Sequence, residues 1–258
     1  MKKLFLPVIA AILTLILLIA GCNVTYIVGT GPMVNKSYDF NNFTEIEISN
    51  AFVYDITRAD NISININCHE NLVEHLDISQ SGNRLYIRMK DGSYTNSDIS
   101  ASLTLPALSK LIVSGASKGS AKGFATNQSM DISVSGASQL ETNIEAGTTG
   151  LDISGASKIK GNLKTSGAHF KVSGASHVTL QGSATADCTL DVSGASTLDI
   201  ADFKMNNADV TVSGASTATI YASGDLKIEV TGASTVKYSG NPNIKALNVS
   251  GASKASRN

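Results

Sequence analysis

The sequence contains no tryptophan, only 5% aromatic residues and only four prolines. So few large side chains argue against an ordinary globular core, in which aromatic residues bury much of the apolar surface. Only one proline, Pro242, lies in the second half of the chain. Proline lacks a backbone donor and interrupts strand ladders, so a long stretch almost without it is compatible with a continuous series of hydrogen-bonded strands.

Positive charge is not in excess either. The chain has 20 lysines and arginines against 21 aspartates and glutamates, and removal of Lys2 and Lys3 with a signal peptide leaves 18 against 21, a net charge of −3. Such a balance provides no general basic surface for the phosphates of a nucleic acid. We therefore predict no nucleic-acid partner.

Cysteine is scarce, and the three residues lie far apart in the sequence, at Cys22, Cys68 and Cys188. Two cysteines beyond Cys22 do not make a disulfide framework. Cys188 alternates in phase with apolar neighbours, which predicts a small buried side chain. Cys68-His69-Glu70 contains residue types that bind metals, but adjacent side chains rarely point to one ion. We predict no metal and no other cofactor.

The N-terminus has the pattern of an export signal. Lys2 and Lys3 precede an almost purely apolar run over residues 4–20, as in secretory signal peptides. The run has about the length of a short membrane helix, so a retained anchor is an alternative reading.

The residues that follow favour lipidation. Leu-Ile-Ala-Gly-Cys at 18–22 resembles the bacterial lipobox, which implies a signal peptide over 1–21 and a lipidated Cys22. Asn23 does not resemble the signal for retention in the inner membrane. The resemblance therefore predicts an exported protein, lipid-anchored in the cell envelope, and in the outer membrane if the host has one.

The second half of the chain repeats the phrase Ser-Gly-Ala-Ser, which we call the repeat phrase. Successive copies are 18 to 21 residues apart, a period typical of a solenoid whose turns bury their apolar face only when stacked. Seven copies have this sequence, and the copy at 231–234 begins with threonine. The copies stand at 114–117, 135–138, 154–157, 173–176, 193–196, 213–216, 231–234 and 250–253.

The residues before each phrase alternate as a half-buried strand does. The positions two and four residues before the glycine are apolar in all eight copies, and the position between them is polar in seven. In the first copy these positions are Val113, Leu111 and Ile112. A second strand follows the phrase, and its inward row is apolar except at Gly119. We interpret the phrase as a corner in which glycine permits the bend, alanine fills the inner volume and the serines bond backbone groups.

These patterns predict an all-β fold: a parallel β-helix, or β-solenoid, expected to be right-handed, with about 18–21 residues per turn. We predict a lipidated tether over 22–37, because Gly29, Gly31 and Pro32 argue against regular structure there. Residues 38–110 are expected to form N-terminal β-rich turns with a short helical insertion, and 111–258 the repeat solenoid.

The lipobox, the alternating stretch after residue 38, the helical interruption near 70–76 and the tandem Val-Ser-Gly-Ala-Ser turns together resemble one family. It is the bacterial putative auto-transporter adhesin head GIN domain family, a domain of unknown function. The resemblance covers about 38–253 and implies a parallel β-helix with an adhesin-like role. It implies no catalytic residues.

The outward row of the strand after the phrase is the candidate binding row. We predict a non-catalytic envelope module that presents this row to a glycan or a protein, or serves a structural role. The row consists of Lys118, Gln139, Lys158, His177, Thr197, Thr217 and Thr235.

Two other functions are alternatives. The first is a carbohydrate-active, polysaccharide-degrading β-helix enzyme, which would use carboxylates clustered on one face. The candidates here are scattered over different rows, which favours a surface-solvating role; they are Asp152, Asp191, Asp199 and Asp209. The second is binding of ice or another surface through the short threonine ladder. His169 and His177 are expected to be solvated surface residues.

The last phrase is followed by only five residues, too few for a cap. An uncovered final turn exposes unpaired backbone groups. Two outcomes are open: the charges of Lys254 and Arg257 protect this edge, or two copies pair end to end through the turn.

Overall fold

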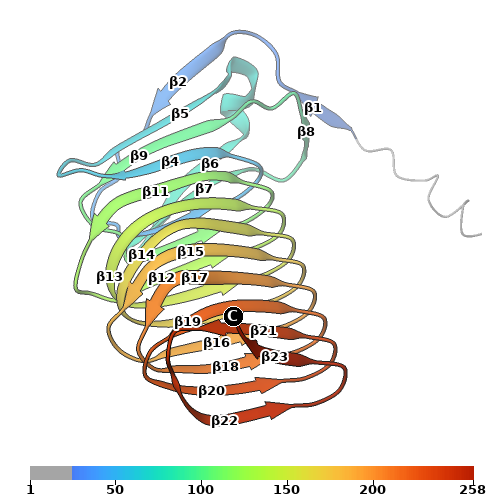
Figure 1. Cartoon of the computed structure of the whole chain (residues 1–258). Helices are drawn as coiled ribbons and strands as arrows, with labels where there is room; N and C mark the ends of the chain where they lie inside the picture. Colours follow the sequence, from blue (N-terminus) through green and yellow to red (C-terminus); the bar gives the residue numbers. More distant parts are fainter. Residues whose placement is uncertain (1–24) are drawn as a thin grey trace, which may run out of the picture.

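The computed structural model describes residues 25–258, so the predicted signal peptide and Cys22 lie outside the described residues. The fold is an all-β solenoid with almost no helix. Figure 1 shows the turns stacked in chain order, from the green β11 to the dark red β22 and β23. The predicted fold class is confirmed. No helix within residues 25–258 has the length and apolar character needed to cross a membrane.

Each turn contributes one strand before the repeat phrase and one after it, and each set stacks in parallel. We call the two stacks the pre-phrase sheet and the post-phrase sheet. β13 (Gln139–Ile153) and β14 (Lys158–Val172) run through the opposite corner without a break, so each belongs to both sheets. The other pre-phrase strands are β7 (Arg84–Met89), β3 (Glu45–Ile48), β10 (Lys110–Val113), β12 (Met130–Val134), β16 (Cys188–Val192), β18 (Ala208–Val212), β20 (Asp225–Val230) and β22 (Asn243–Val249). The other post-phrase strands are β9 (Ser100–Leu105), β4 (Val53–Arg58), β11 (Lys118–Ala125), β15 (His177–Ala184), β17 (Thr197–Met205), β19 (Thr217–Ala222), β21 (Thr235–Ser239) and β23 (Lys254–Arg257).

The strand pairing follows the rows that the sequence predicts. Leu111 pairs with Ile132, which pairs with Leu151, and the register continues through the later turns. Both apolar rows before the phrase are buried in every turn except the last. The core is therefore a column of stacked aliphatic side chains, to which Phe170 and Phe203 add an edge-to-face pair of rings.

The repeat phrase forms the corner, and its glycine is required by the stacking. From Gly136 onward each phrase glycine has a φ near +75 to +80°, which other residues adopt only at a cost. The alanine N–H donates to the glycine carbonyl of the preceding turn, as from Ala156 to Gly136 at 2.7 Å. The turns approach so closely that a Cβ on Gly155 would lie 2.4 Å from the Gly136 oxygen. Only glycine fits this ladder.

Our interpretation of the phrase alanine was wrong. Every phrase alanine is exposed, whereas the second serine of the phrase is the residue that faces inward. In the later turns this serine donates to a glycine carbonyl of the preceding turn, as from Ser216 to Gly194 at 3.2 Å. The bend turns the alanine outward and the small hydroxyl inward. Ser117, Ser138 and Ser157 have no hydrogen-bond partner for Oγ within the described structure.

The one exception in the inward row after the phrase has a packing explanation. Gly119 pairs with Tyr54 of the neighbouring turn, and a Cβ on Gly119 would lie 2.5 Å from the Tyr54 ring. The buried Tyr54 hydroxyl donates to the Gln139 carbonyl at 3.1 Å. Burial also raises the pKa of this phenol. The tyrosine of one turn thus occupies the space that the next turn leaves empty.

A ninth corner lies outside the repeat that we counted. Ser49-Asn50-Ala51-Phe52 aligns with the phrase at 114–117, because β3 pairs with β10 and β4 with β11 in register. Asn50 has a φ of +65°, and asparagine is among the non-glycine residues that tolerate this region best. The turn β3–β4 is sandwiched between β7–β9 on one side and β10–β11 on the other. After β4 the chain leaves the stack. It returns first as β7 and β9 on one side of the turn β3–β4, and then as β10 and β11 on the other side.

This part of the chain closes the N-terminal end of the solenoid, and we call it the N-terminal cap. It includes β5 (Ser63–His69), the 3-10 helix η1 (Glu70–His75), β6 (Leu76–Ser81) and β8 (Ser93–Thr95). β5 pairs antiparallel with β9, and β6 with β7. The predicted helical interruption is thus one short 3-10 segment whose Leu72 is buried.

The segment before residue 38 differs from the predicted irregular tether. Its described part contains β1 (Tyr26–Val28), which pairs with β8, and β2 (Met33–Ser37), which pairs antiparallel with β5. Gly29, Gly31 and Pro32 lie between these two strands. The glycines and the proline mark the turn, and the residues on either side extend the cap.

Both cysteines of the described chain are free and buried. Cys188 lies in the inward row, as predicted, and burial raises the pKa of its thiol to about 11. Burial also raises the pKa of the Cys68 thiol. Cys68 points inward, while the His69 ring next to it contacts the Gly31 carbonyl at 2.9 Å, so the two side chains diverge.

The last turn has its inward face uncovered. Ile244, Leu247 and Val249 of β22 are exposed, although their counterparts in earlier turns are buried. End-to-end pairing of two copies through this turn stays a prediction. We expect the sedimentation coefficient of the chain to rise with protein concentration and the Leu247→Lys variant to lose this dependence. A wild-type chain that stays monomeric at high concentration would contradict the pairing.

Candidate binding groove

The predicted binding row forms one continuous column on the post-phrase sheet. Its members pair in strict succession across seven strands. Lys118, Gln139, Lys158 and His177 are exposed, whereas the three threonines at the C-terminal end are partly buried. The structure therefore brings together all seven residues, with charged and longer side chains toward the N-terminal end.

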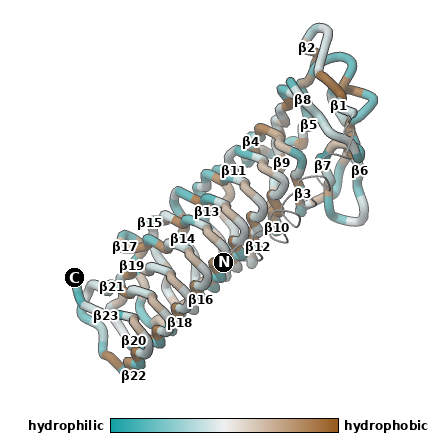
Figure 2. Tube along the Cα trace, turned by 90° about the vertical axis from the view of Figure 1, so that its right-hand side faces the viewer, coloured by the Kyte–Doolittle hydropathy of each residue, from teal (hydrophilic) through white to brown (hydrophobic). Residues whose placement is uncertain are grey.

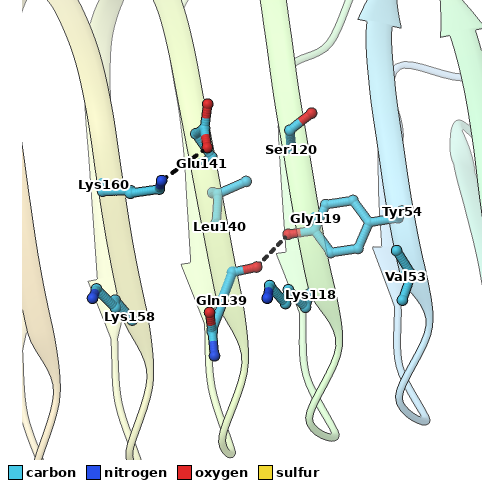
Figure 3. A pocket seen from close by; sticks show the side chains of 10 residues that line it. All are labelled: Val53, Tyr54, Lys118, Gly119, Ser120, Gln139, Leu140, Glu141, Lys158 and Lys160. Carbon is cyan, nitrogen blue, oxygen red and sulfur yellow. Dashed lines mark hydrogen bonds and ion pairs between the residues drawn. The ribbon is translucent and has the colours of Figure 1, made fainter.

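A second column lies two residues further along the same strands. Ser120, Glu141 and Lys160 occupy it on β11, β13 and β14, and they pair in register. The residues between the columns point inward, so main chain forms the floor between the two lines of side chains. The result is a groove of about 470 Å³, shown in Figure 3. We call it the basic groove; it is lined by Val53, Tyr54, Lys118, Gly119, Ser120, Gln139, Leu140, Glu141, Lys158 and Lys160.

Glu141 is held between two lysines. Its carboxylate lies 2.7 Å from Lys122 Nζ and 3.1 Å from Lys160 Nζ. Hydrogen bonds from Lys122 and Lys160 hold the pKa of Glu141 below its usual range. The carboxylate therefore stays charged at lower pH than a free glutamate, and it fixes Lys160 at the wall of the groove (Figure 3).

Lys118 and Lys158 have no such partner. Neither side chain makes an ion pair or hydrogen bond within residues 25–258, and both ammonium groups border the groove. The two lysines are separated by one strand, so their backbones lie about 10 Å apart along the solenoid. This spacing presents two unneutralised charges to anything that lies along the groove.

The opposite face has a groove of about 420 Å³ with a different charge. There the pre-phrase sheet contributes Lys110 and Lys171 together with Asp131 and Asp152, and Lys110 Nζ lies 3.9 Å from Asp131. Two lysines thus balance two aspartates. In the basic groove three lysines face one glutamate, which gives a formal charge of +2. Of these two grooves, the basic groove suits an anion better.

Sequence reasoning found the first column and missed the second. Strand alternation contains the missing signal, because residues two apart on a strand share a face. Counting five residues past the phrase glycine gives Ser120, Glu141 and Lys160 directly. What counting does not give is the bridge from Glu141 to Lys122 and Lys160, which decides which lysines remain unpaired.

The carboxylates proposed for catalysis are not gathered in one place. Asp152 and Asp191 share a column of the pre-phrase sheet, with Lys171 between them. Asp209 lies in a neighbouring column on β18, and Asp199 lies on β17 of the post-phrase sheet. Within residues 25–258 no three histidines, cysteines or carboxylates gather as a metal site. His169 is exposed and hydrogen-bonds Thr189.

The sequence matches a family model, and the fold matches solved structures. The family model "Putative auto-transporter adhesin, head GIN domain" matches residues 42–242. No curated protein matches the sequence. Among solved structures, a "putative adhesin" of Parabacteroides distasonis has a TM-score of 0.81, with 16% identity over 91% of this chain and 100% of that one.

Two further structures have the same architecture. A "putative adhesin" of Parabacteroides merdae has a TM-score of 0.82, with 16% identity over 90% of this chain and 99% of that one. A "putative lipid binding protein" of Parabacteroides distasonis has a TM-score of 0.85, with 16% identity over 91% of this chain and 100% of that one. At this identity the likeness establishes the fold.

Proposed function

Because the chain belongs to the putative auto-transporter adhesin, head GIN domain family, we propose that it is a non-catalytic binding module of the cell envelope. In this proposal Cys22 carries a lipid that anchors the exported protein, and the basic groove holds the ligand. The family and two of the similar solved structures are described as adhesins, which supports a surface-binding role.

The ligand class follows from the charge of the groove. The observation that carries the proposal is the pair Lys118 and Lys158, which border the groove without ion-pair partners. An acidic polysaccharide suits such a site, because its carboxylates recur along an extended chain and its hydroxyl groups can bond Gln139 and Ser120. The groove runs across the strands, so a long polymer can lie along the solenoid.

The test compares polymers that differ in charge. We expect the protein to bind immobilised polygalacturonate and not neutral dextran. The double variant Lys118→Glu/Lys158→Glu should bind polygalacturonate at least tenfold more weakly, equivalent to about 1.4 kcal/mol. Binding of the wild type should also weaken as salt is added, since the interacting charges are exposed. Biolayer interferometry measures both effects.

The control makes the same charge change on the other face. Lys110→Glu/Lys171→Glu alters the groove of the pre-phrase sheet and should keep wild-type affinity. Equal binding of dextran and polygalacturonate, or equal losses from the two double variants, would contradict the site. Shortening of the polymer during incubation would favour the polysaccharide-degrading alternative, and thermal hysteresis without polymer binding would favour ice binding.

A further inference from the structure

Three large apolar side chains are exposed at the N-terminal end of the solenoid. Tyr26, Val28 and Met33 are 58%, 47% and 44% exposed. This end is already closed by β2, β5, β6 and η1, so a missing turn does not account for the exposure. Figure 2 shows β1 in brown at the opposite end of the rod from β22. These three residues are therefore separate from the uncovered last turn.

The segment that carries these residues is fixed to the folded body. Tyr26 and Val28 lie on the outer side of β1, while Ile27 between them packs against the core. The Gly29 N–H donates to the Thr95 carbonyl at 2.9 Å, and Asn71 Nδ2 donates to the Val28 carbonyl at 2.8 Å. From Tyr26 onward the chain is part of the cap and cannot serve as a spacer.

This attachment limits the distance to the proposed anchor. Only three residues separate Cys22 from Tyr26, and four fully extended steps span at most about 14 Å. A lipid on Cys22 therefore holds the cap against the bilayer surface. Within the cap, the exposed apolar residues Tyr26 and Val28 are among the nearest to Cys22 in the sequence.

We infer that Tyr26, Val28 and Met33 insert into the interfacial layer of the membrane and form the foot on which the solenoid stands. The inference rests on the proposed lipidation of Cys22. Tyrosine is enriched at membrane interfaces, where its ring is buried and its hydroxyl is hydrated. The affinity for a membrane increases with the apolar area that is buried in it. Insertion of these side chains therefore adds to the attachment that the lipid provides. The basic groove then lies further along the rod, away from the bilayer.

The absence of tryptophan allows a direct test. Tyr26→Trp in the full, lipidated chain places a single tryptophan, which can be excited selectively over the tyrosines, in the foot. In phosphatidylcholine vesicles with brominated acyl chains, we expect its emission to shift to the blue and to be quenched at least twofold. Thr235→Trp, on β21 near the other end, is the matched control and should be quenched little.

Flotation of the same vesicles separates this inference from the anchor. If the protein floats and Tyr26→Trp is quenched, the foot is supported. If the protein floats and the two tryptophan variants are quenched equally little, the foot is wrong and the anchor stands. If the protein does not float, and behaves like Cys22→Ala, the anchor and the foot both fail.

Discussion

Replacing Gly174 with alanine is expected to destabilise the solenoid by at least about 3 kcal/mol, a value in the range of severe single substitutions. Gly174 has a φ of +77°, and a Cβ there would lie 2.3 Å from the Gly155 oxygen. The neighbouring atom belongs to the backbone of the stacked turn, so it can move only if the two turns separate. Urea denaturation followed by circular dichroism measures the loss.

Two controls separate backbone strain from stacking. Gly82 also has a positive φ, of +59°, but a Cβ there meets nothing within 4 Å. Gly82→Ala should therefore cost only about 1–2 kcal/mol, the cost of the left-handed conformation. Ala175→Ser, at the exposed neighbouring position, should change stability by less than about 0.5 kcal/mol. Equal losses from Gly174→Ala and Gly82→Ala would show that the stacking contact is not limiting.

Truncating Leu190 to alanine is expected to cost about 2–5 kcal/mol, as for other fully buried leucines. Leu190 and Leu247 occupy the same inward row, four residues before a phrase glycine. Leu190 is fully buried between turns, whereas Leu247 is 46% exposed. Each turn of a solenoid is stabilised mainly by its neighbours, so the central leucine loses contacts on two sides.

Leu247→Ala is the matched control, with the same change at the same position of the repeat. We expect it to cost about 1 kcal/mol or less, because much of its apolar surface is already in contact with water. Comparable destabilisation by the two variants would contradict the view that burial by the next turn is the source of stability. Calorimetry or urea denaturation at low protein concentration, where end-to-end pairing is suppressed, makes the comparison.

Most of the repeat could be predicted because each turn repeats the same local pattern. The apolar rows, the corner and the succession from Lys118 to Thr235 follow from strand alternation and a nearly constant spacing. The orientation of the phrase alanine could not be predicted, because the conformation of the bend decides which small residue faces inward. The space at Gly119 required knowledge of Tyr54, which is 65 residues earlier in the sequence.

The N-terminal cap was hardest to predict because its pairings do not follow chain order. β3 and β4 lie between two turns that come later in the sequence, so counting along the chain does not identify their neighbours. Asn50 replaces the phrase glycine at the first corner. For this reason the ninth corner was not recognised from the repeated phrase. Gly29, Gly31 and Pro32 led us to predict an irregular tether before residue 38, whereas strands lie on both sides of them.

We propose that the basic groove is where this family member holds an acidic polymer. Lysine acetylation read by mass spectrometry, with and without saturating polygalacturonate, tests it at single residues. We expect Lys118 and Lys158 to become protected from acetylation, whereas Lys171 on the opposite sheet keeps its reactivity. Protection of Lys171 with unchanged labelling of Lys118 and Lys158 would contradict it.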